Sequence, residues 1–205
     1  KRINYAKDDA AGSAIAVRLT AEIQGLAVAS RNAADGQSLL DTAEGALQET
    51  QTLLMRLREL AVQSSNGTLT TSDRGALQAE AAALEAEISR ISDTTSWGGI
   101  NLLDGSLSDG ITFQVGTKAG ETITTSIPDM AATAATIAIS VGFSIGTFTN
   151  AQSMITAVDA AISGVGTVRG NLGAASNRLN STIANLDQVR VNLSASRGRI
   201  QDADF

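Results

Sequence analysis

The chain has 205 residues, and its 15 Lys and Arg against 21 Asp and Glu give a net charge of −6. Because charged residues make up only 18% and form no basic cluster, the composition argues against nucleic acid and anionic membrane surfaces as partners. The absence of His and Cys excludes histidine bases, thiol nucleophiles and disulfides, and no apolar run reaches the length of about 18 residues that a membrane span needs.

Residues 1–63 carry a long helical pattern in which apolar residues recur every seven positions. The repeat runs through Leu19, Leu26, Ala33, Leu40, Leu47, Leu54 and Ala61. A seven-residue repeat kept over this length predicts a coiled-coil-like seam on a helix about 90 Å long. Gly25, Gly36 and Gly45 each cost such a helix about 1 kcal/mol relative to Ala. They either permit close approach of another helix or mark local kinks.

A second, shorter helix is predicted after a loop at residues 64–68. Ser72 and Asp73 offer an N-cap. Apolar residues follow at spacings of three and four: Leu77, Ala81, Leu84, Ile88 and Ile91. The helix should end before Trp97, and the short loop should fold it back antiparallel on the first helix.

The middle of the chain has the pattern of a small β-sheet. Ile111, Phe113 and Val115 alternate with polar residues, and the turn at 116–120 leads into a second strand over 121–127. This pattern predicts a hairpin, which Pro128 closes. Two further strands are expected, one through Ile137, Ile139 and Val141 and one through Phe143, Ile145 and Phe148.

From about residue 151 the helical period returns and continues to the end of the chain, with a weak point at 164–173. The expected fold is mainly α with a small β part: an elongated antiparallel helical rod with a long first, a shorter second and a long last helix. The expected domains are 1–105 for the N-terminal helical half, 106–150 for the β-hairpin region and 151–205 for the C-terminal helix. The proposed seam consists of Leu19, Leu26, Leu40, Leu47, Leu54, Leu77, Leu84, Ile88, Leu172, Leu179, Leu186 and Leu193.

The motifs that carry chemistry in other proteins are incomplete here. Asp8 and Asp9 are adjacent on a helix and point about 100° apart, so they do not converge on one proton or metal. The glycines at 164–170 lack phosphate-loop spacing, and residues 104–109 lack the ligands of a calcium loop. We therefore predict no catalytic, cofactor or metal site, and no enzyme.

Two features of the surface point toward partners. Aromatic residues are only 3% and charges are few, so the thinly charged surface is either covered by partners or simply rich in alanine. Arg56, Leu60 and Gln63 lie along one helical face, away from the seam side. This face is either a solvated surface or a binding patch.

Several segments resemble bacterial flagellin, and together they cover nearly the whole chain except about 129–150. They are residues 2–4, 6–12, 29–33, 44–47 and 58–64 in the first half, 114–116 and 120–123 in the hairpin, and 169–174, 177–178 and 194–204 near the C-terminus. The resemblance implies a secreted structural subunit that polymerises into the flagellar filament for motility. It further implies a core that lacks the terminal polymerisation segments, with the outer domains absent or reduced to a short stretch.

The resemblance also implies partners. These are other flagellin subunits, an export chaperone and the filament cap. In some flagellins a Toll-like innate receptor binds the helical core, and Arg56, Leu60, Gln63 and Glu80 match the contacting positions of the family. Met55 departs from the polar residue often found at its position. The same surface serves subunit packing, so the match leaves both roles open.

One alternative is a cell-surface adhesin or polysaccharide-binding receptor built on a flagellin core, with 117–150 as its contact region. The six aromatic residues offer few platforms for stacking sugars. A hook–filament junction protein shares the end motifs, but it should lack the 58–64 segment present here.

Overall fold

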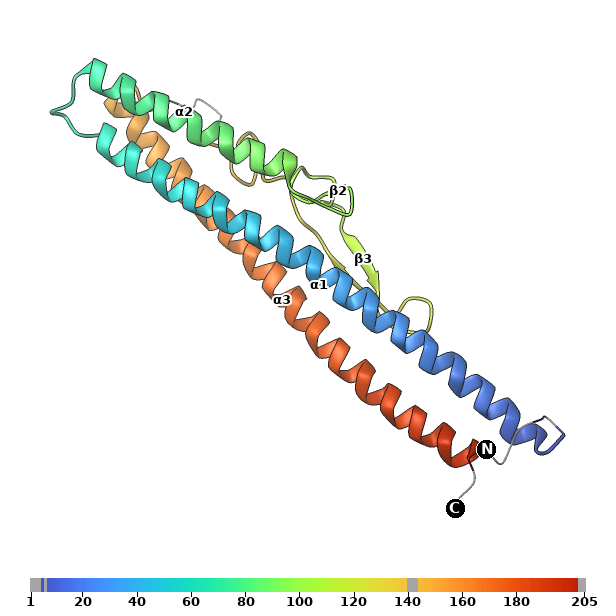
Figure 1. The fold of residues 1–205 in the computed structure, drawn as a ribbon. Helices are drawn as coiled ribbons and strands as arrows, with labels where there is room; N and C mark the ends of the chain where they lie inside the picture. The colour runs from blue at the N-terminus through green and yellow to red at the C-terminus, as the bar shows by residue number, and fades with distance from the viewer. Residues whose placement is uncertain (1–4, 6, 140–143, 203–205) are drawn as a thin grey trace. The chain divides into compact units, whose positions relative to one another are not determined.

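A computed structural model gives the structure of residues 5, 7–139 and 144–202. Within these described residues, three helices and four short strands follow one another: α1 (Ala10–Ser64), α2 (Thr71–Thr94), β1 (Ser96–Trp97), β2 (Ile100–Asn101), β3 (Ile111–Gln114), β4 (Thr122–Thr125) and α3 (Phe148–Gln201) (Figure 1). The expected fold class is confirmed: the chain has a long first helix, a shorter second helix, a long last helix and a small β part. No helix within the described residues is long and apolar enough to cross a bilayer.

The chain divides into two compact units. Unit 1 combines Lys1–Ser38, Thr112–Thr124 and Ala175–Phe205, and unit 2 combines Leu39–Ile111 and Thr125–Ala174. Both α1 and α3 contribute residues to each unit. The units therefore group segments from both ends of the sequence, whereas the ranges 1–105, 106–150 and 151–205 follow chain order.

In unit 1, the first half of α1 and the last part of α3 run antiparallel. Leu26 and Ala29 form a buried cluster with Leu186, and Val189 and Leu193 pack against it. Nearer the start of α1, Arg197 Nη1 lies 3.3 Å from Thr20 Oγ1 as a hydrogen-bond donor. The earlier α1 residue, Thr20, contacts the later α3 residue, Arg197, while Leu26 contacts Leu186. The two segments therefore run in opposite directions.

The β3–β4 hairpin lies on α1 in the same unit. A Cβ on Gly25 would come within 2.9 Å of Thr117 Cγ2, and one on Gly36 within 2.9 Å of Phe113 Cδ1. Between them, Asn32 Nδ2 donates to the carbonyl oxygen of Gln114 at 3.1 Å. These two glycines thus make room for the hairpin and not for another helix. A Cβ on Gly45, in unit 2, would meet no atom within 4 Å among the described residues.

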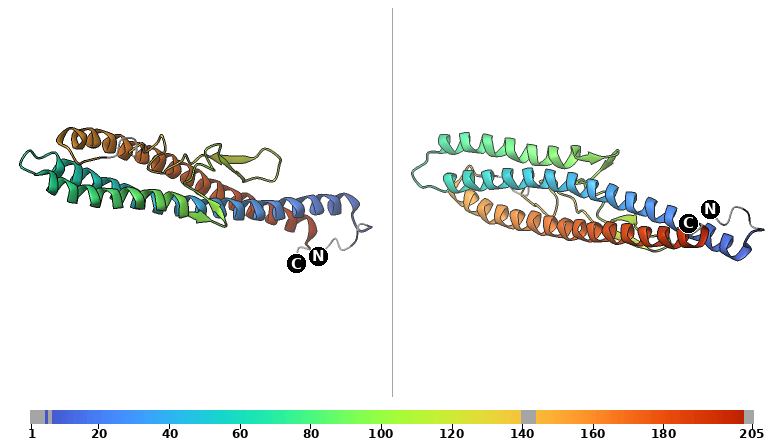
Figure 2. Two further views of the ribbon diagram at one scale, coloured as in Figure 1. Left: turned by 90° about the horizontal axis from the view of Figure 1, so that it is seen from above. Right: turned by 60° about the horizontal axis from the view of Figure 1, so that its bottom comes forward.

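In unit 2, α1 is contacted by both other helices. Figure 2 shows α2 alongside the second half of α1, and Arg56 on α1 bonds Glu80 on α2. On α3, Arg169 pairs with Glu44 and Asp159 with Arg58. The hydrophobic effect favours burial of apolar side chains between these helices, at roughly 1.5–3 kcal/mol for each fully buried Leu.

The seam positions differ in burial. Those that are buried are Leu26, Leu40, Leu47, Leu54, Ile88, Leu172, Leu179 and Leu186, whereas Leu19, Leu77, Leu84 and Leu193 are only half-buried.

The start of α2 lies slightly earlier than the sequence predicted. Thr70 is the N-cap: its hydroxyl accepts from Asp73 N, and the Asp73 carboxylate accepts from Thr70 N at 2.9 Å. This reciprocal capping box satisfies two backbone donors that a helix start leaves open. After α2, Gly98 and Gly99 adopt φ values of 58° and 84°, which allows the tight turn that pairs β1 with β2. The sequence pattern did not predict this hairpin.

The two strands predicted between 137 and 148 are wrong for the residues that the structure describes. Ile137 and Ile139 are buried but not in a strand, because Ala138 has φ 46° and Ile139 N bonds back to Ala132 O at 3.0 Å. Phe148 begins α3, whose first turn is capped by Thr147: its Oγ1 accepts from Asn150 N at 3.2 Å. Val141 and Phe143 lie outside the described residues.

The weak point expected at 164–173 does not interrupt α3, which is continuous from Phe148 to Gln201. Gly164 instead faces the 128–139 segment, because a Cβ there would lie 2.6 Å from the carbonyl oxygen of Thr136. This glycine therefore permits close packing of a loop on the helix.

Candidate functional site

Arg56 is the centre of an exposed ionic cluster on α1 and α2 in unit 2. Its Nη2 and Nε donate to Glu80 Oε1 at 2.7 and 2.9 Å, and its Nη1 donates to Glu59 Oε2 at 2.9 Å. The hydrogen bond with Glu80, followed by the one with Glu59, raises the pKa of the Arg56 guanidinium. The Arg56 cation is thus held between the carboxylates of Glu59 and Glu80, and about half or more of each of the three side chains is exposed.

Leu60 does not belong to this exposed surface. Only 1% of it is accessible, which corrects its predicted place beside Arg56 and Gln63. Because α2 covers a second face of α1 in unit 2, the buried row of α1 widens to include Leu60. Gln63 and Glu80 are exposed, so Arg56, Gln63 and Glu80 form what we call the Arg56 surface.

Apolar side chains are also exposed on this part of α1. Met55 and Val62 are 46% and 47% accessible. Met55 was noted from the sequence because it departs from the polar residue often found at its position in the family. Val62 was not singled out, although the sequence shows that it lies outside the seven-residue repeat. Met55 and Val62 thus add exposed apolar area to a part of α1 that otherwise presents paired charges.

The connection from α1 to α2 is held by side chains that the sequence pattern did not single out. Arg74 Nε donates to Ser64 O and its Nη2 to Asn66 O, both at 2.9 Å. Ile145 N donates to Gln78 Oε1 at 2.5 Å, and Ser64 Oγ donates to Ile145 O. These bonds fix the end of α1 relative to the start of α2. They thereby help to position the Arg56 surface, to which both helices contribute.

Two ion pairs link α1 to α3. Arg58 Nε lies 2.6 Å from Asp159 Oδ1, and the hydrogen bond to this carboxylate raises the pKa of Arg58. Arg169 Nη2 and Nε donate to Glu44 Oε1 at 2.6 and 2.8 Å, and Nη1 donates to Gln51. Glu44 Oε2 is buried without a hydrogen bond to any described residue. The pairs fix the register of the two helices in unit 2.

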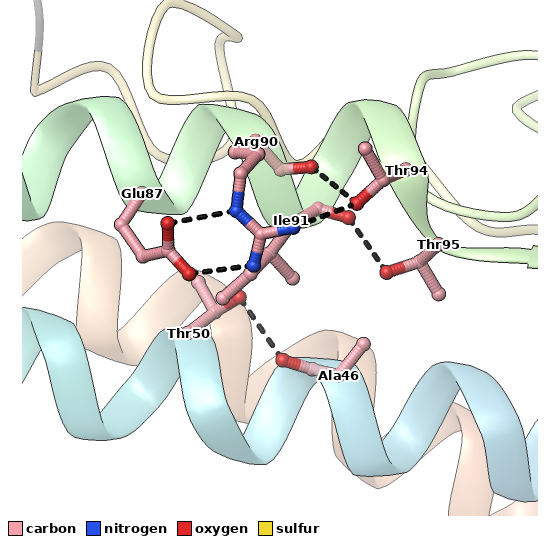
Figure 3. Close-up of polar contacts among 7 residues, drawn as sticks. All are labelled: Ala46, Thr50, Glu87, Arg90, Ile91, Thr94 and Thr95. Carbon is pink, nitrogen blue, oxygen red and sulfur yellow. Dashed lines mark hydrogen bonds and ion pairs between the residues drawn. The ribbon is translucent and has the colours of Figure 1, made fainter.

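A groove runs between α1 and α2 nearer β1. Ala46, Glu49 and Leu53 line it from α1, and Glu87, Arg90 and Ile91 are among the α2 residues that line it. Figure 3 shows the Arg90 guanidinium turned onto the Glu87 carboxylate, with Nη2 to Oε1 at 2.6 Å and Nε to Oε2 at 2.8 Å. The bond to Arg90 lowers the pKa of Glu87. Glu87 and Arg90 of this groove are thus engaged with each other, whereas Glu49, the other carboxylate that lines it, does not take part in this pair.

The described residues contain no cluster of three or more His, Cys, Asp or Glu side chains that could hold a metal ion. What unit 2 presents instead is a set of paired charges, an open groove and isolated apolar side chains. Such an arrangement is suited to binding another protein surface.

Comparison with known proteins identifies the family. Residues 1–108 match the family model of the bacterial flagellin N-terminal helical region, and residues 155–205 match that of the bacterial flagellin C-terminal helical region. The flagellin of Halalkalibacterium halodurans is 47% identical over 204 residues, which are 100% of this chain and 74% of that protein. The chain belongs to the bacterial flagellin family. Flagellins are structural proteins of the flagellum.

Other flagellins match over part of their length. The B-type flagellin of Pseudomonas aeruginosa is 56% identical over 133 residues, which are 65% of this chain but only 27% of that protein. Among solved structures, the Bacillus cereus flagellin has a TM-score of 0.67 at 30% identity, covering 76% of this chain and 88% of that one.

A putative flagellar hook-associated protein from Vibrio parahaemolyticus has a TM-score of 0.82 and covers 95% of this chain and 100% of that one. Its 17% identity shows a shared fold alone.

The flagellin segments of the sequence occupy the elements described above. The 58–64 segment forms the end of α1, 114–116 and 120–123 belong to the β3–β4 hairpin region, and 169–174 lies within α3. The resembling residues at 2–4, 6 and 203–204 lie outside the described residues.

Proposed function

We propose that this flagellin is a structural subunit that polymerises into the extracellular filament of the bacterial flagellum and so serves motility. The observation that carries the proposal is the match of both flagellin helical regions within one chain, with 47% identity to a flagellin along its length. The low charge content and the exposed apolar residues on α1 support extensive contacts between copies.

The Arg56 surface is our candidate for one of these contacts. Its ion pairs hold Arg56 and Glu80 in fixed positions, so a partner meets an ordered surface and loses little side-chain entropy on binding. We propose a neighbouring subunit as its partner in the filament and a Toll-like receptor as its partner on the free subunit. Leu60, being buried, would support this surface from beneath. An export chaperone and the filament cap complete the proposed partners.

The filament proposal is tested by polymerisation. The chain is extended at both ends with the segments that flank the matched region in the Halalkalibacterium halodurans flagellin, and short filaments are added as seeds. We expect long filaments of the extended chain in electron micrographs. Persistent monomers of the extended chain, with intact helical circular dichroism, would count against the assignment.

Binding to the Arg56 surface is tested with Arg56→Ala, and Arg31→Ala serves as a control because Arg31 is an exposed arginine of the same helix in unit 1. If the surface is a subunit contact, the first variant polymerises more slowly than the second. Equal rates for the two variants would remove the Arg56 surface from the filament contacts.

A further inference from the structure

The charges of this flagellin are unevenly divided between its two units. Unit 1 has ten Lys and Arg against eight Asp and Glu, a net charge of +2, whereas unit 2 has five against thirteen, a net charge of −8. Two copies of unit 2 therefore repel each other, while unit 1 of one copy and unit 2 of another attract.

In unit 2 the cations are already engaged. Arg56, Arg58, Arg90 and Arg169 each pair with a carboxylate, and Arg74 donates to backbone carbonyls. The excess of negative charge is thus left for a partner to neutralise.

The groove between α1 and α2 holds one such unneutralised charge. Glu87 there is paired with Arg90, as Figure 3 shows. Glu49, on the other helix, is exposed and forms neither an ion pair nor a side-chain hydrogen bond with the described residues. The apolar side chains of Leu53 and Ile91 lie in the same groove. This groove, which we call the acidic groove, therefore offers an apolar lining and a single free carboxylate.

Unit 1 has a groove of the opposite sign between the hairpin region and α3. Val115 and Ile123 contribute buried apolar side chains, and α3 contributes Asn177, Arg178 and Ser181. Arg178 is its single ionised residue, and within the described part of the chain it has no ion pair and no side-chain hydrogen bond. We call it the Arg178 groove. An arginine over an apolar floor can bind a carboxylate through two parallel hydrogen bonds.

We propose that the Arg178 groove of one copy docks on the acidic groove of a second copy, with Arg178 facing Glu49. This inference rests on the proposed filament function and specifies which surfaces of neighbouring subunits meet. The contact is heterologous, because a different surface of each copy takes part. In a pair joined in this way, the acidic groove of the first copy and the Arg178 groove of the second remain unoccupied. Each can bind a further copy, so a heterologous contact that does not close on itself propagates into a chain of subunits. The repulsion between two acidic units disfavours the symmetric dimer that would stop growth.

Cysteine cross-linking tests which surfaces meet, because the chain has no native cysteine. Asn177→Cys places a thiol in the Arg178 groove and Ala46→Cys places one in the acidic groove, with both charges kept. Filaments grown from a mixture of the two extended chains, one bearing a size tag, should give disulfide dimers of tagged and untagged chains on mild oxidation. Asn177→Cys mixed with Gly67→Cys, an exposed loop position, is the matched control.

Cross-linking in the control mixture to the same extent, or between identical Asn177→Cys chains, would overturn the proposal. So would the absence of mixed dimers in filaments that form normally.

Charge reversal tests the ionic contact itself. We expect Arg178→Glu to raise the critical concentration for polymerisation about tenfold, in line with the coupling of close charge pairs across interfaces. Adding Glu49→Lys to the same chain should restore most of the loss. Arg18→Glu makes the same charge change in unit 1 outside the groove, and Glu49→Lys should not rescue it.

The wild-type extended chain separates this inference from the filament function. If it polymerises and Arg178→Glu behaves like wild type, the docking is refuted and the filament function stands. If the wild-type chain itself does not polymerise, the filament function fails.

Discussion

Gly164 allows the stability of unit 2 to be tested with one methyl group. A Cβ at this position would lie 2.6 Å from the carbonyl oxygen of Thr136, far inside van der Waals contact and against backbone that cannot rotate away. Crowding of this kind costs about 1–3 kcal/mol, while replacing Gly by Ala within a helix gains up to about 1 kcal/mol. Because the clash is with backbone, we take the upper part of the range and expect Gly164→Ala to lower the free energy of unfolding by about 1–2 kcal/mol.

Gly166 provides the control two residues along the same helix. A Cβ there meets nothing within 4 Å among the described residues, so Gly166→Ala should raise the free energy of unfolding by up to about 1 kcal/mol. Urea unfolding of the two variants, followed by helical circular dichroism, should separate their free energies of unfolding by about 1–3 kcal/mol, with the two variants on opposite sides of wild type. If Gly164→Ala is as stable as Gly166→Ala, the close approach of the 128–139 segment to α3 is wrong.

The hairpin contact and the helix cap give two more predictions. Gly36→Ala should destabilise the chain relative to Gly45→Ala by about 1–3 kcal/mol, because its methyl meets the Phe113 ring, and urea unfolding in a Phe113→Ala background should abolish that difference. Hydrogen bonds from the Thr70 hydroxyl and backbone N–H lower the pKa of Asp73 below its ordinary value of 3.8. The contribution of the ionised Asp73 carboxylate to the free energy of unfolding is therefore complete above about pH 5, and it declines as the pH falls toward the folded-state pKa. The stability difference between wild type and Asp73→Ala in urea titrations should therefore be constant from about pH 5 to 7 and shrink below about pH 4; a difference that grows on acidification would contradict the sign.

The helices were predictable because their apolar residues are spaced with the period of the elements that bury them. Leu40, Leu47 and Leu54 are all almost fully buried, as expected for a repeat that follows one side of a helix. Leu60 was misplaced because the repeat describes only one buried face, and its spacing does not reveal that α2 covers a second one.

The irregular segments were harder to predict because their contacts come from outside the segment. Ile137 and Ile139 alternate as strand residues do, but a left-handed Ala138 turns the chain there and no local sequence signal announces it. The start of α2 could have been found, since Thr70 and Asp73 have the spacing of a capping box. The groove at Arg178 could not, because it needs the hairpin and α3 to lie side by side.

Unit 1 has a consequence for when this protein can fold. Its helical contacts join residues that are far apart in the sequence: Thr20 and Arg197 are separated by 177 positions in numbering. A growing polypeptide that has not yet reached Ala175–Phe205 leaves the first half of α1 without its apolar neighbour, and bringing such distant partners together is entropically slow. Synthesis must therefore pass through residues 175–205 before this unit acquires a stable interior. Until then, the first half of α1 lacks these packing partners and remains accessible to other proteins that bind the nascent polypeptide.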